Sequence, residues 1–440
     1  MTPARFLLSM LAFAVVCAAA VAGFSVLVDP HLIFNRPRVA GFNAVKPAAE
    51  TRERLMKAYQ AMRVAPRTVV VGTSRSDIGM DPASKAWPEG MLPVYNLSMV
   101  AADVGTNLRN LEHMAATRRG LPMPQYLIVG LDFETFFLYH LRTAGRSALR
   151  RADIGSPSLA QESDERFEQL AMGHTLPRGR VLQDMGRALF TVDGFVDSIN
   201  SVVASRLGNP GPDLLPDGRL SDGQLRQWNL ADGVEVVFNQ KNVDTLRQYR
   251  EPRLVLSETP GGVMPEMAQV RAMIAFARQH KMKLILAVQP THMSRLELLD
   301  HLGYWPEFER WKRVLAETVA EAAATQADVT LWDFAGFEPP VREPMPQGRQ
   351  RSTPLQYFWD PVHYSSSLGD VLISSMLGNA KAPNFGAVLT PATLEARLLQ
   401  VRQDREEFKR LQPEDARAIR RLYCAALKAC TTPVGSAGGG

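Results

Sequence analysis

Short apolar runs recur along the chain, and the first of them, rich in valine, ends at Gly72. Such runs are typical of strands buried on both faces of a parallel sheet. Segments with apolar residues at helical spacing lie between them. Alternating strands and helices predict an α/β fold, with a mostly parallel sheet covered on both faces. The pattern predicts strands at 67–72, 94–97, 126–131, 283–288 and 329–332, and helices at 48–62, 107–118, 265–280, 308–323 and 368–377.

The segment 6–28 contains no charged residue. At about 1.5 Å per residue, such a helix reaches roughly 35 Å, enough to cross a hydrocarbon core of about 30 Å. Arg5 and Asp29 flank it, so the positive-inside rule places residues 1–5 in the cytoplasm and the bulk of the chain in the periplasm. A cleaved signal peptide is the alternative, because small residues at 18–23 could host a processing site. The apolar run continues past that site, which favours an uncleaved single-pass anchor in the inner membrane.

A long segment rich in Arg, Ser, Gly, Pro and Asp interrupts the alternation after the third predicted strand. We interpret it as an insertion that caps a sheet edge, with helical pieces near 163–172 and 193–207. The end of the chain is predicted to be helical, with mixed charges typical of a solvated face. The predicted organisation is a cytoplasmic terminus (1–5), an anchor (6–28), a linker and helix (29–66), an α/β domain in two parts (67–140 and 259–380), the insertion (141–258) and a helical tail (381–440).

Composition narrows the class of protein. The chain has 440 residues, 46% hydrophobic and 22% charged, which excludes a disordered or a small disulfide-stapled protein. Its formal net charge of +5 is spread along the chain and does not indicate nucleic-acid binding. The eight histidines are scattered, and no Cys-x-x-Cys or His-x-His grouping occurs. We therefore expect no metal and no other cofactor.

Cysteine usage fits an exported protein. Cys17 lies inside the apolar run, which leaves Cys424 and Cys430 for pairing in an oxidising periplasm. Residues six apart do not face each other on a continuous helix. A disulfide therefore requires the helix to end between them, and the sequence leaves this pairing open.

The first candidate for chemistry is Ser74, two residues after the glycine that ends the first predicted strand. Ligands of open parallel sheets bind beyond the carboxyl ends of the strands, and a strand-to-helix turn presents a side chain there. The second glycine of a Gly-x-Ser-x-Gly elbow is missing, so this is not an α/β-hydrolase signature. The alternative is that Ser74 or Ser76 caps a short helix.

The second candidate is the pair Asp360 and His363, three residues apart just before a predicted apolar helix. A turn can aim both side chains in one direction, so that the carboxylate orients an imidazole able to take a serine's proton. The alternative is a capping Asp and a structural His. Together, the serine turn and the Asp360 and His363 pair favour a catalytic site more strongly than either does alone.

These motifs resemble the SGNH, or GDSL, hydrolase superfamily: a strand followed by Gly-x-Ser, an Asn-Leu turn some twenty residues on, and an Asp-x-x-His ahead of the last helix. The resemblance spans roughly residues 67–378. It implies a three-layer α/β/α sandwich, with Ser74 as nucleophile, His363 as general base and Asp360 as its partner. It is closest to the membrane-anchored periplasmic branch, whose members act in O-acetylation of alginate and other exopolysaccharides and in D-alanylation of teichoic acids.

The chain departs from the family at two oxyanion positions. Ala101 stands where the family has a glycine, which a backbone donor tolerates, and Asp132 stands where the family has an asparagine that donates through its amide. An ionised carboxylate only accepts hydrogen bonds. Losing one oxyanion donor typically costs roughly 2.7–4 kcal/mol of transition-state stabilisation. Arg75, beside the nucleophile, is a candidate substitute, with a surface arginine as the alternative.

Other residues at the predicted carboxyl edge are weaker candidates. His292 follows the fourth predicted strand and could line a substrate site, although a pocket wall or a helix cap is the simpler interpretation. Trp359 could stack on a sugar ring. Trp305 and Trp311 lie at helical spacing and are predicted to be core residues.

Two hypotheses follow from the sequence. The first is a membrane-anchored O-acyltransferase or esterase that acts on a polysaccharide beside a membrane acyltransferase or polysaccharide synthase complex. The second is a non-catalytic scaffold that keeps the fold and binds glycan or partner proteins. Asp132 and Ala101 favour the scaffold, whereas the serine, histidine and aspartate set favours the enzyme.

Overall fold

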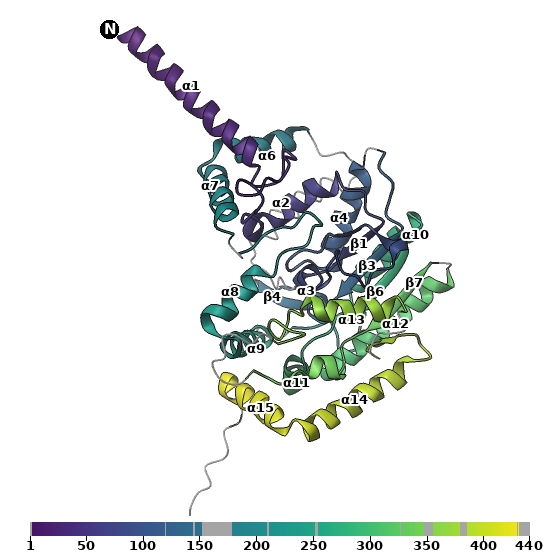
Figure 1. The fold of residues 1–440 in the computed structure, drawn as a ribbon. Helices are drawn as coiled ribbons and strands as arrows, with labels where there is room; N and C mark the ends of the chain where they lie inside the picture. The colour runs from purple at the N-terminus through teal and green to yellow at the C-terminus, as the bar shows by residue number, and fades with distance from the viewer. Residues whose placement is uncertain are drawn as a thin grey trace, which may run out of the picture.

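The protein is described by a computed structural model covering residues 2–118, 120–143, 146–151, 178–208, 211–250, 254–325, 327–346, 355–378, 385–428 and 430. Within these residues, six strands form one sheet in the order β2-β1-β3-β6-β7-β8 (Figure 1). Neighbouring strands from β2 to β7 are parallel, and β8 is antiparallel to β7. The predicted α/β fold with a mostly parallel sheet is therefore confirmed, although the pattern does not predict β8. The strands are β1 (Thr68–Val71), β2 (Val94–Asn96), β3 (Tyr126–Leu131), β6 (Lys283–Val288), β7 (Val329–Asp333) and β8 (Ala387–Val388).

The central strands pack against two hydrophobic cores. Side chains at alternate positions of a strand belong to different cores, because successive side chains point to opposite faces of the sheet. Val69 and Val71 pack in one core with apolar residues of α4, α10 and α12. Val70 packs in the other core with Leu368 and Leu372 of α13. The helices predicted from the sequence match α2 (Ala49–Ala61), α4 (Val104–Thr117), α10 (Met267–Gln279), α12 (Trp305–Ala324) and α13 (Ser366–Met376).

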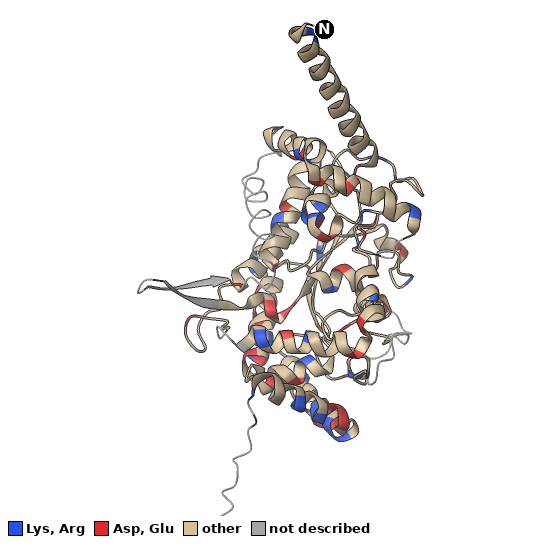
Figure 2. Ribbon diagram, turned by 90° about the vertical axis from the view of Figure 1, so that its left-hand side faces the viewer, with Lys and Arg blue, Asp and Glu red and all other residues tan. Residues whose placement is uncertain are grey.

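α1 (Pro3–Val28) projects from the rest of the molecule (Figure 1 and Figure 2), and Arg5 is its one charged residue. Its length and apolar composition are sufficient to cross a membrane. The last turn is held by the rest of the protein. Lys46 Nζ donates to the carbonyl oxygens of Val28 (2.7 Å) and Asp29 (3.0 Å), which satisfies carbonyl groups that a helix end leaves unpaired.

The predicted insertion forms several elements with different neighbours. α6 and α7 pack against α1, and α9 packs against α8 and α15. α7 matches the helix predicted at 193–207, whereas the one predicted at 163–172 lies outside the described residues. One segment does cap a sheet edge, since Asn96 of β2 donates its N–H to the Asp217 carbonyl (2.9 Å). The elements described are β4 (Leu138–Thr143), β5 (Arg146–Arg151), α6 (Arg178–Phe190), α7 (Val192–Leu207), α8 (Gly223–Asp232) and α9 (Val234–Arg250).

The prediction that the mixed charges of the tail form a solvated face holds for most of them, since Arg402, Glu406 and Arg410 are exposed. The other side of the tail packs on the domain. Leu398 and Phe408 are buried in the core, and Arg405 is buried where it pairs with Glu297 and Asp300. Of these charges, Arg405 therefore meets carboxylates of another helix rather than water. The tail consists of α14 (Leu394–Leu411) and α15 (Pro413–Leu427).

A disulfide joins Cys424 to Cys430, with Cα atoms 5.1 Å apart. α15 ends at Leu427, and Lys428 adopts a left-handed conformation (φ 50°) that turns the chain back. The helix thus ends between the two cysteines, as the pairing requires. The free thiol of Cys17 is exposed on α1.

Candidate active site

Ser74 is the first residue of α3 (Ser74–Gly79), which follows β1 at the carboxyl end of the strand. Thr73 caps this helix, and its hydroxyl accepts a hydrogen bond from the Arg75 N–H (3.3 Å). The Ser74 N–H, at the start of the helix, has no carbonyl partner within it. The turn places the half-buried Ser74 side chain at the edge where open parallel sheets bind ligands.

Asp360 and His363 lie in a loop that is closed on itself just before α13. Phe358 and Tyr364 form an antiparallel bridge across it, and Trp359 donates its N–H to the His363 carbonyl (2.9 Å). Asp360 Oδ1 accepts from two backbone N–H groups of the same loop (2.7 and 2.8 Å). The turn therefore aims the carboxylate and the imidazole in one direction, as the spacing of three predicts.

The structure brings these two segments together. Ser74 Oγ lies 2.9 Å from His363 Nε2, and His363 Nδ1 lies 2.7 Å from Asp360 Oδ2. Asp360 is fully buried, while the His363 side chain is 15% exposed. Since Ser74 and His363 are 289 residues apart in the chain, the fold and not the local sequence creates this serine, imidazole and carboxylate relay.

The electrostatics of Asp360 suit a partner of His363. Burial alone would raise the pKa of Asp360, but the His363 imidazole and the backbone donors lower it to about 2. The carboxylate is therefore ionised at neutral pH and accepts from Nδ1–H. That hydrogen bond fixes the tautomer in which Nε2 can accept the Ser74 proton.

A close helix crossing positions the loop over the serine turn. A Cβ on Gly369 of α13 would lie 1.9 Å from the Gly79 carbonyl oxygen of α3, and a Cβ on Gly79 would lie 2.0 Å from the Tyr364 ring. Only residues without a side chain allow this approach. The two glycines thus let Tyr364, and with it the neighbouring His363, lie against the helix that begins at Ser74.

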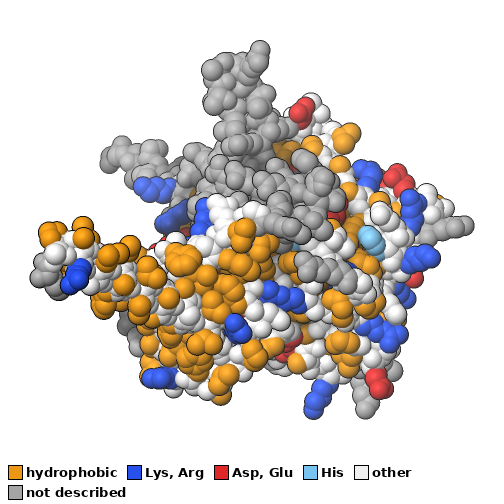
Figure 3. Space-filling model, turned by 90° about the horizontal axis from the view of Figure 1, so that it is seen from above, with side chains coloured by type: hydrophobic (Ala, Val, Ile, Leu, Met, Phe, Trp, Pro, Cys, Tyr) orange, Lys and Arg blue, Asp and Glu red, His pale blue; other side chains and the backbone are white. Residues whose placement is uncertain are grey.

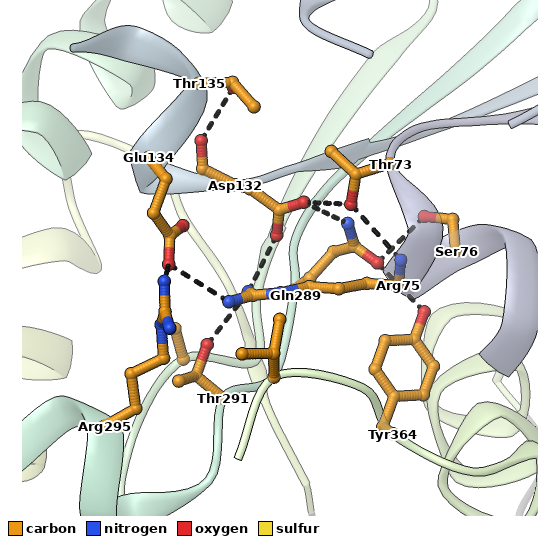
Figure 4. Close-up of polar contacts among 12 residues, drawn as sticks. Thr73, Arg75, Ser76, Asp132, Glu134, Thr135, Gln289, Thr291, Arg295 and Tyr364 are labelled. Carbon is orange, nitrogen blue, oxygen red and sulfur yellow. Dashed lines mark hydrogen bonds and ion pairs between the residues drawn. The ribbon is translucent and has the colours of Figure 1, made fainter. Parts of the chain in front are cut away.

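Asp132 follows β3 and is buried beside the serine turn (Figure 4). It accepts hydrogen bonds from Thr73 Oγ1 (2.5 Å), Arg75 Nη1 (2.8 Å) and Gln289 Nε2 (3.0 Å). Burial raises the pKa of Asp132, and Arg75 offsets this only in part. Because Thr73 and Arg75 flank Ser74, Asp132 holds the turn from both sides. It is an acceptor for all three partners and not a donor in the manner of the family's amide.

Arg75 belongs to a buried ionic cluster. Its Nη1 also donates to Thr291 Oγ1 (3.0 Å), and its Nη2 donates to Glu134 (3.1 Å), which pairs in turn with Arg295 (2.7 Å). Burial opposes ionisation of Glu134, but the two arginines lower its pKa to about 2. The prediction that Arg75 substitutes as oxyanion donor therefore does not hold, because buried carboxylates already engage its guanidinium.

Gln289, directly after β6, links the serine turn to the histidine loop (Figure 4). Its Oε1 accepts from Ser76 Oγ (2.8 Å) and from the Tyr364 hydroxyl (3.0 Å). Ser76 thus points into this network and not toward the relay. The signal that could have revealed these residues is positional, since several of them directly follow parallel strands. Sequence reasoning considered Ser76 only as a helix cap. It assigned no role to Thr73, Glu134, Gln289, Thr291, Arg295 and Tyr364.

Ala101 is exposed in the loop after β2 and has a φ of 54°. This left-handed conformation favours glycine, which agrees with the glycine that the resemblance expects there. Met99, in the same loop, donates its N–H to the Gly72 carbonyl (3.1 Å). The loop is therefore tied to the end of β1, two residues before Ser74.

His292 is buried at the start of α11 (Met293–His301), where it caps the helix. Its Nδ1 lies 2.9 Å from Ser294 Oγ, and its Nε2 lies 2.8 Å from the Glu343 carbonyl oxygen. Burial lowers the pKa of His292 to about 4. The assignment as a substrate-binding residue is therefore wrong, and the capping interpretation holds, because protein groups occupy both ring nitrogens.

The prediction that Trp305 and Trp311 are core residues is confirmed, and the stacking of Trp359 on a sugar stays a prediction. Trp305 and Trp311 are buried in the core. Trp359, next to Asp360, is half-buried, and the Arg226 guanidinium lies 5.1 Å from the centroid of its ring. Over the part of the chain that the structure describes, no group of His, Cys, Asp and Glu could hold a metal ion.

No protein-family model matches the sequence of this chain, and no curated protein matches it significantly. The chemistry of the site is therefore inferred from its geometry. A hydroxyl, an imidazole and a buried carboxylate in hydrogen-bond contact can activate the hydroxyl as a nucleophile toward an ester or a similar acyl group.

Proposed function

We propose that this chain is an SGNH-type serine O-acyltransferase or esterase with the three-layer α/β/α sandwich of that superfamily. It acts, in this proposal, on acyl groups, most simply O-acetyl groups, of a cell-surface or secreted polysaccharide. The observation that carries the proposal is the hydrogen-bonded relay of Ser74, His363 and Asp360 at the carboxyl edge of a parallel sheet.

The reaction proceeds through an acyl-serine. Ser74 Oγ attacks the acyl carbonyl carbon while His363 Nε2 takes the hydroxyl proton. The tetrahedral intermediate then collapses, and the same nitrogen returns the proton to the departing alcohol oxygen. In the second half, His363 takes a proton from an acceptor hydroxyl whose oxygen attacks the serine ester, and Ser74 regains its proton. A glycan hydroxyl as acceptor gives transfer, and water gives hydrolysis.

Backbone N–H groups of Ser74 and Ala101 are the donors that we assign to the oxyanion. The third donor of the family is missing, because Asp132 accepts hydrogen bonds from Thr73, Arg75 and Gln289. One lost donor typically costs roughly 2.7–4 kcal/mol. We therefore expect slow turnover compared with an enzyme that has an asparagine at this position.

The apolar helix α1 indicates the cellular compartment of the proposed reaction. We propose that α1 anchors the protein in the inner membrane, with the α/β domain in the periplasm. An anchored enzyme there is suited to work beside a membrane acyltransferase or a polysaccharide synthase complex, which supplies the acyl group or the polymer.

The deciding experiment compares Ser74→Ala with Ser84→Ala, which removes a hydroxyl outside the relay. Purified full-length proteins are treated with a fluorophosphonate probe, and acylation of the polymer is measured in cells. We expect labelling and acylation in the wild type and in Ser84→Ala, and neither in Ser74→Ala. All three proteins should unfold cooperatively, and Ser84→Ala should melt slightly lower because it loses a hydrogen bond to Asp370. Equal labelling or acylation in Ser74→Ala overturns the proposal.

A scaffold that binds glycan or partner proteins is the second candidate, and Asp132 is the observation that favours it. Its carboxylate replaces a catalytic amide with a group that stabilises the turn. The scaffold predicts no adduct on Ser74 in folded protein and full function in cells for His363→Ala. Loss of function in His363→Ala, with normal protein levels, counts against it.

A further inference from the structure

α7 has the opposite amphipathicity to that of a helix on a water-exposed surface. Val192 and Leu207 are 77% and 76% exposed, whereas its buried face consists of small and polar residues. The exposed apolar stripe is Val192, Val196, Ile199, Val203 and Leu207, and the buried face is Gly194, Ser198, Ser201 and Ala204. At 100° per residue, these two sets of side chains fall on opposite sides of the helix.

α6 repeats this arrangement. Leu182 and Phe190 are exposed, whereas Asp184 is buried with its carboxylate 3.1 Å from the Tyr59 hydroxyl. Figure 3, seen from the side toward which α1 projects, shows hydrophobic side chains gathered beside α1. Large exposed apolar patches mark surfaces that meet a partner or a membrane.

Both helices pack against the C-terminal part of α1. Phe24 meets Phe195 of α7 edge to face, with ring centroids 6.0 Å apart, and the hydroxyl oxygens of Ser25 and Ser198 are 3.3 Å apart. Residues 3–20 of α1 are exposed. At about 1.5 Å per residue, they span about 27 Å, close to the hydrocarbon thickness of about 30 Å. If they fill the hydrocarbon layer, the membrane surface falls where α7 covers α1.

We propose that α6 and α7 form a second membrane-binding element, whose exposed apolar stripe inserts into the interfacial layer of the lipid bilayer that α1 spans. The bilayer is the occupant because the stripe continues the exposed apolar surface of α1. Arg187 and Arg206, exposed on the same helices, suit the lipid phosphate layer. The inference rests on α1 spanning the membrane and is independent of the proposed acyl chemistry. Two attachments of this kind fix the tilt of the domain over the membrane.

The test measures where the stripe lies when the full-length protein is reconstituted in vesicles of phosphatidylethanolamine and phosphatidylglycerol. Spin labels are placed at Ile199→Cys and Val203→Cys in a Cys17→Ser background. Leu399→Cys on α14, also an exposed apolar position, is the matched control. A label on native Cys17 reports whether α1 itself lies in lipid. Collision of each label with oxygen and with a water-soluble nickel complex is then compared.

We expect the ratio of oxygen to nickel accessibility at 199 and 203 to exceed that at 399 several-fold and to approach that at Cys17. Nickel accessibility at both stripe positions equal to that at 399 overturns the proposal. Protection from both reagents also overturns it, because it shows a second copy of the protein covering the stripe. A water-exposed Cys17 overturns it as well, since α1 then does not set the membrane level. None of these outcomes depends on Ser74, so a failure here is distinct from a failure of the proposed function.

Discussion

At the scale of single residues, Asp360 has an effect on catalysis that can be isolated. Asp360→Asn keeps the size of the side chain but holds the His363 ring in the wrong tautomer, so that Nε2 no longer accepts the Ser74 proton. We expect the rate of fluorophosphonate labelling and of ester hydrolysis to fall by about 10⁴-fold. Asp328→Asn, at an exposed carboxylate, is the control and should be unchanged. Wild-type rates in Asp360→Asn would contradict a catalytic role for the relay.

The same carboxylate also contributes to stability in a pH-dependent way. Its folded pKa of about 2 lies below the ordinary value of 3.8, so the ionised form stabilises the fold above about pH 4 and this contribution is lost as the pH falls toward 2. We expect the wild type to exceed Asp360→Asn in free energy of unfolding by about 2 kcal/mol near neutral pH. The difference should shrink toward pH 2 in denaturant titrations. A difference that stays constant from pH 7 to pH 2 would show that the charge is not its source.

Asp132 can be tested by the substitution that makes the site resemble the family more closely. Asp132→Asn removes the charge that Arg75 pairs with, and breaking a buried ion pair costs about 3 kcal/mol. We therefore expect a lower free energy of unfolding and a lower kcat/KM toward a small ester, because the Ser74 turn is held less firmly. A rise in kcat/KM would mean instead that this position faces the oxyanion, contrary to the geometry described above.

Sequence patterns predict the three residues of the relay but not the buried residues that hold them in place. Ser74, Asp360 and His363 stand next to recognisable elements, a valine-rich strand and an apolar helix, so their positions at one edge follow from the fold class. The partners of Arg75 come from turns after different strands, and their meeting depends on the strand order in the sheet. That order is a property of tertiary packing, which the local pattern does not contain.

At the scale of elements, buried strands are the most predictable part of this protein. β1, β3 and β6 lie between two cores, so each reads as a continuous apolar run. β8 has only two residues and leaves no periodicity. The burial of Arg405 in the tail was not predicted for a physical reason: its partners, Glu297 and Asp300, come from a distant segment.

The crossing of α3 and α13 gives a prediction at this scale. Gly369→Ala forces a Cβ against the Gly79 carbonyl, and overpacking of this kind typically costs about 1–3 kcal/mol. We expect α13 to move away from α3 and carry His363 with it, so that kcat falls together with the free energy of unfolding. Gly186→Ala, in α6 with no atom within 4 Å of its new Cβ, is the matched control and should leave both quantities unchanged or slightly raise stability. Equal behaviour of the two variants would show that the crossing tolerates a side chain.

At the scale of the whole molecule, α1 is joined to the domain as a structural element. Ser25 and Val28 are buried, and Asp29 accepts hydrogen bonds from the N–H groups of Phe34 and Arg36 (both 3.1 Å). Burial lowers the pKa of Lys46, which holds the last carbonyls of α1, to about 8. In the proposed anchor, a helix integrated in this way would direct the domain relative to the membrane, which a leader without tertiary contacts does not do.

The charges that flank α1 lead to a prediction about membrane topology. Because Arg5 flanks α1 on the N-terminal side and Asp29 follows it, the positive-inside rule places the domain on the periplasmic face. Alkaline phosphatase fused to the C-terminus should therefore be active in cells, and green fluorescent protein fused there should not fluoresce. The protein should also keep its full mass and remain in the membrane pellet after carbonate extraction, as expected of an uncleaved helix that spans the bilayer. A fluorescent fusion would place the Ser74 site in the cytoplasm and exclude an envelope polysaccharide as its substrate. A shortened, soluble product would show that the α1 segment is cleaved, and the domain would then reach its polymer without an anchor.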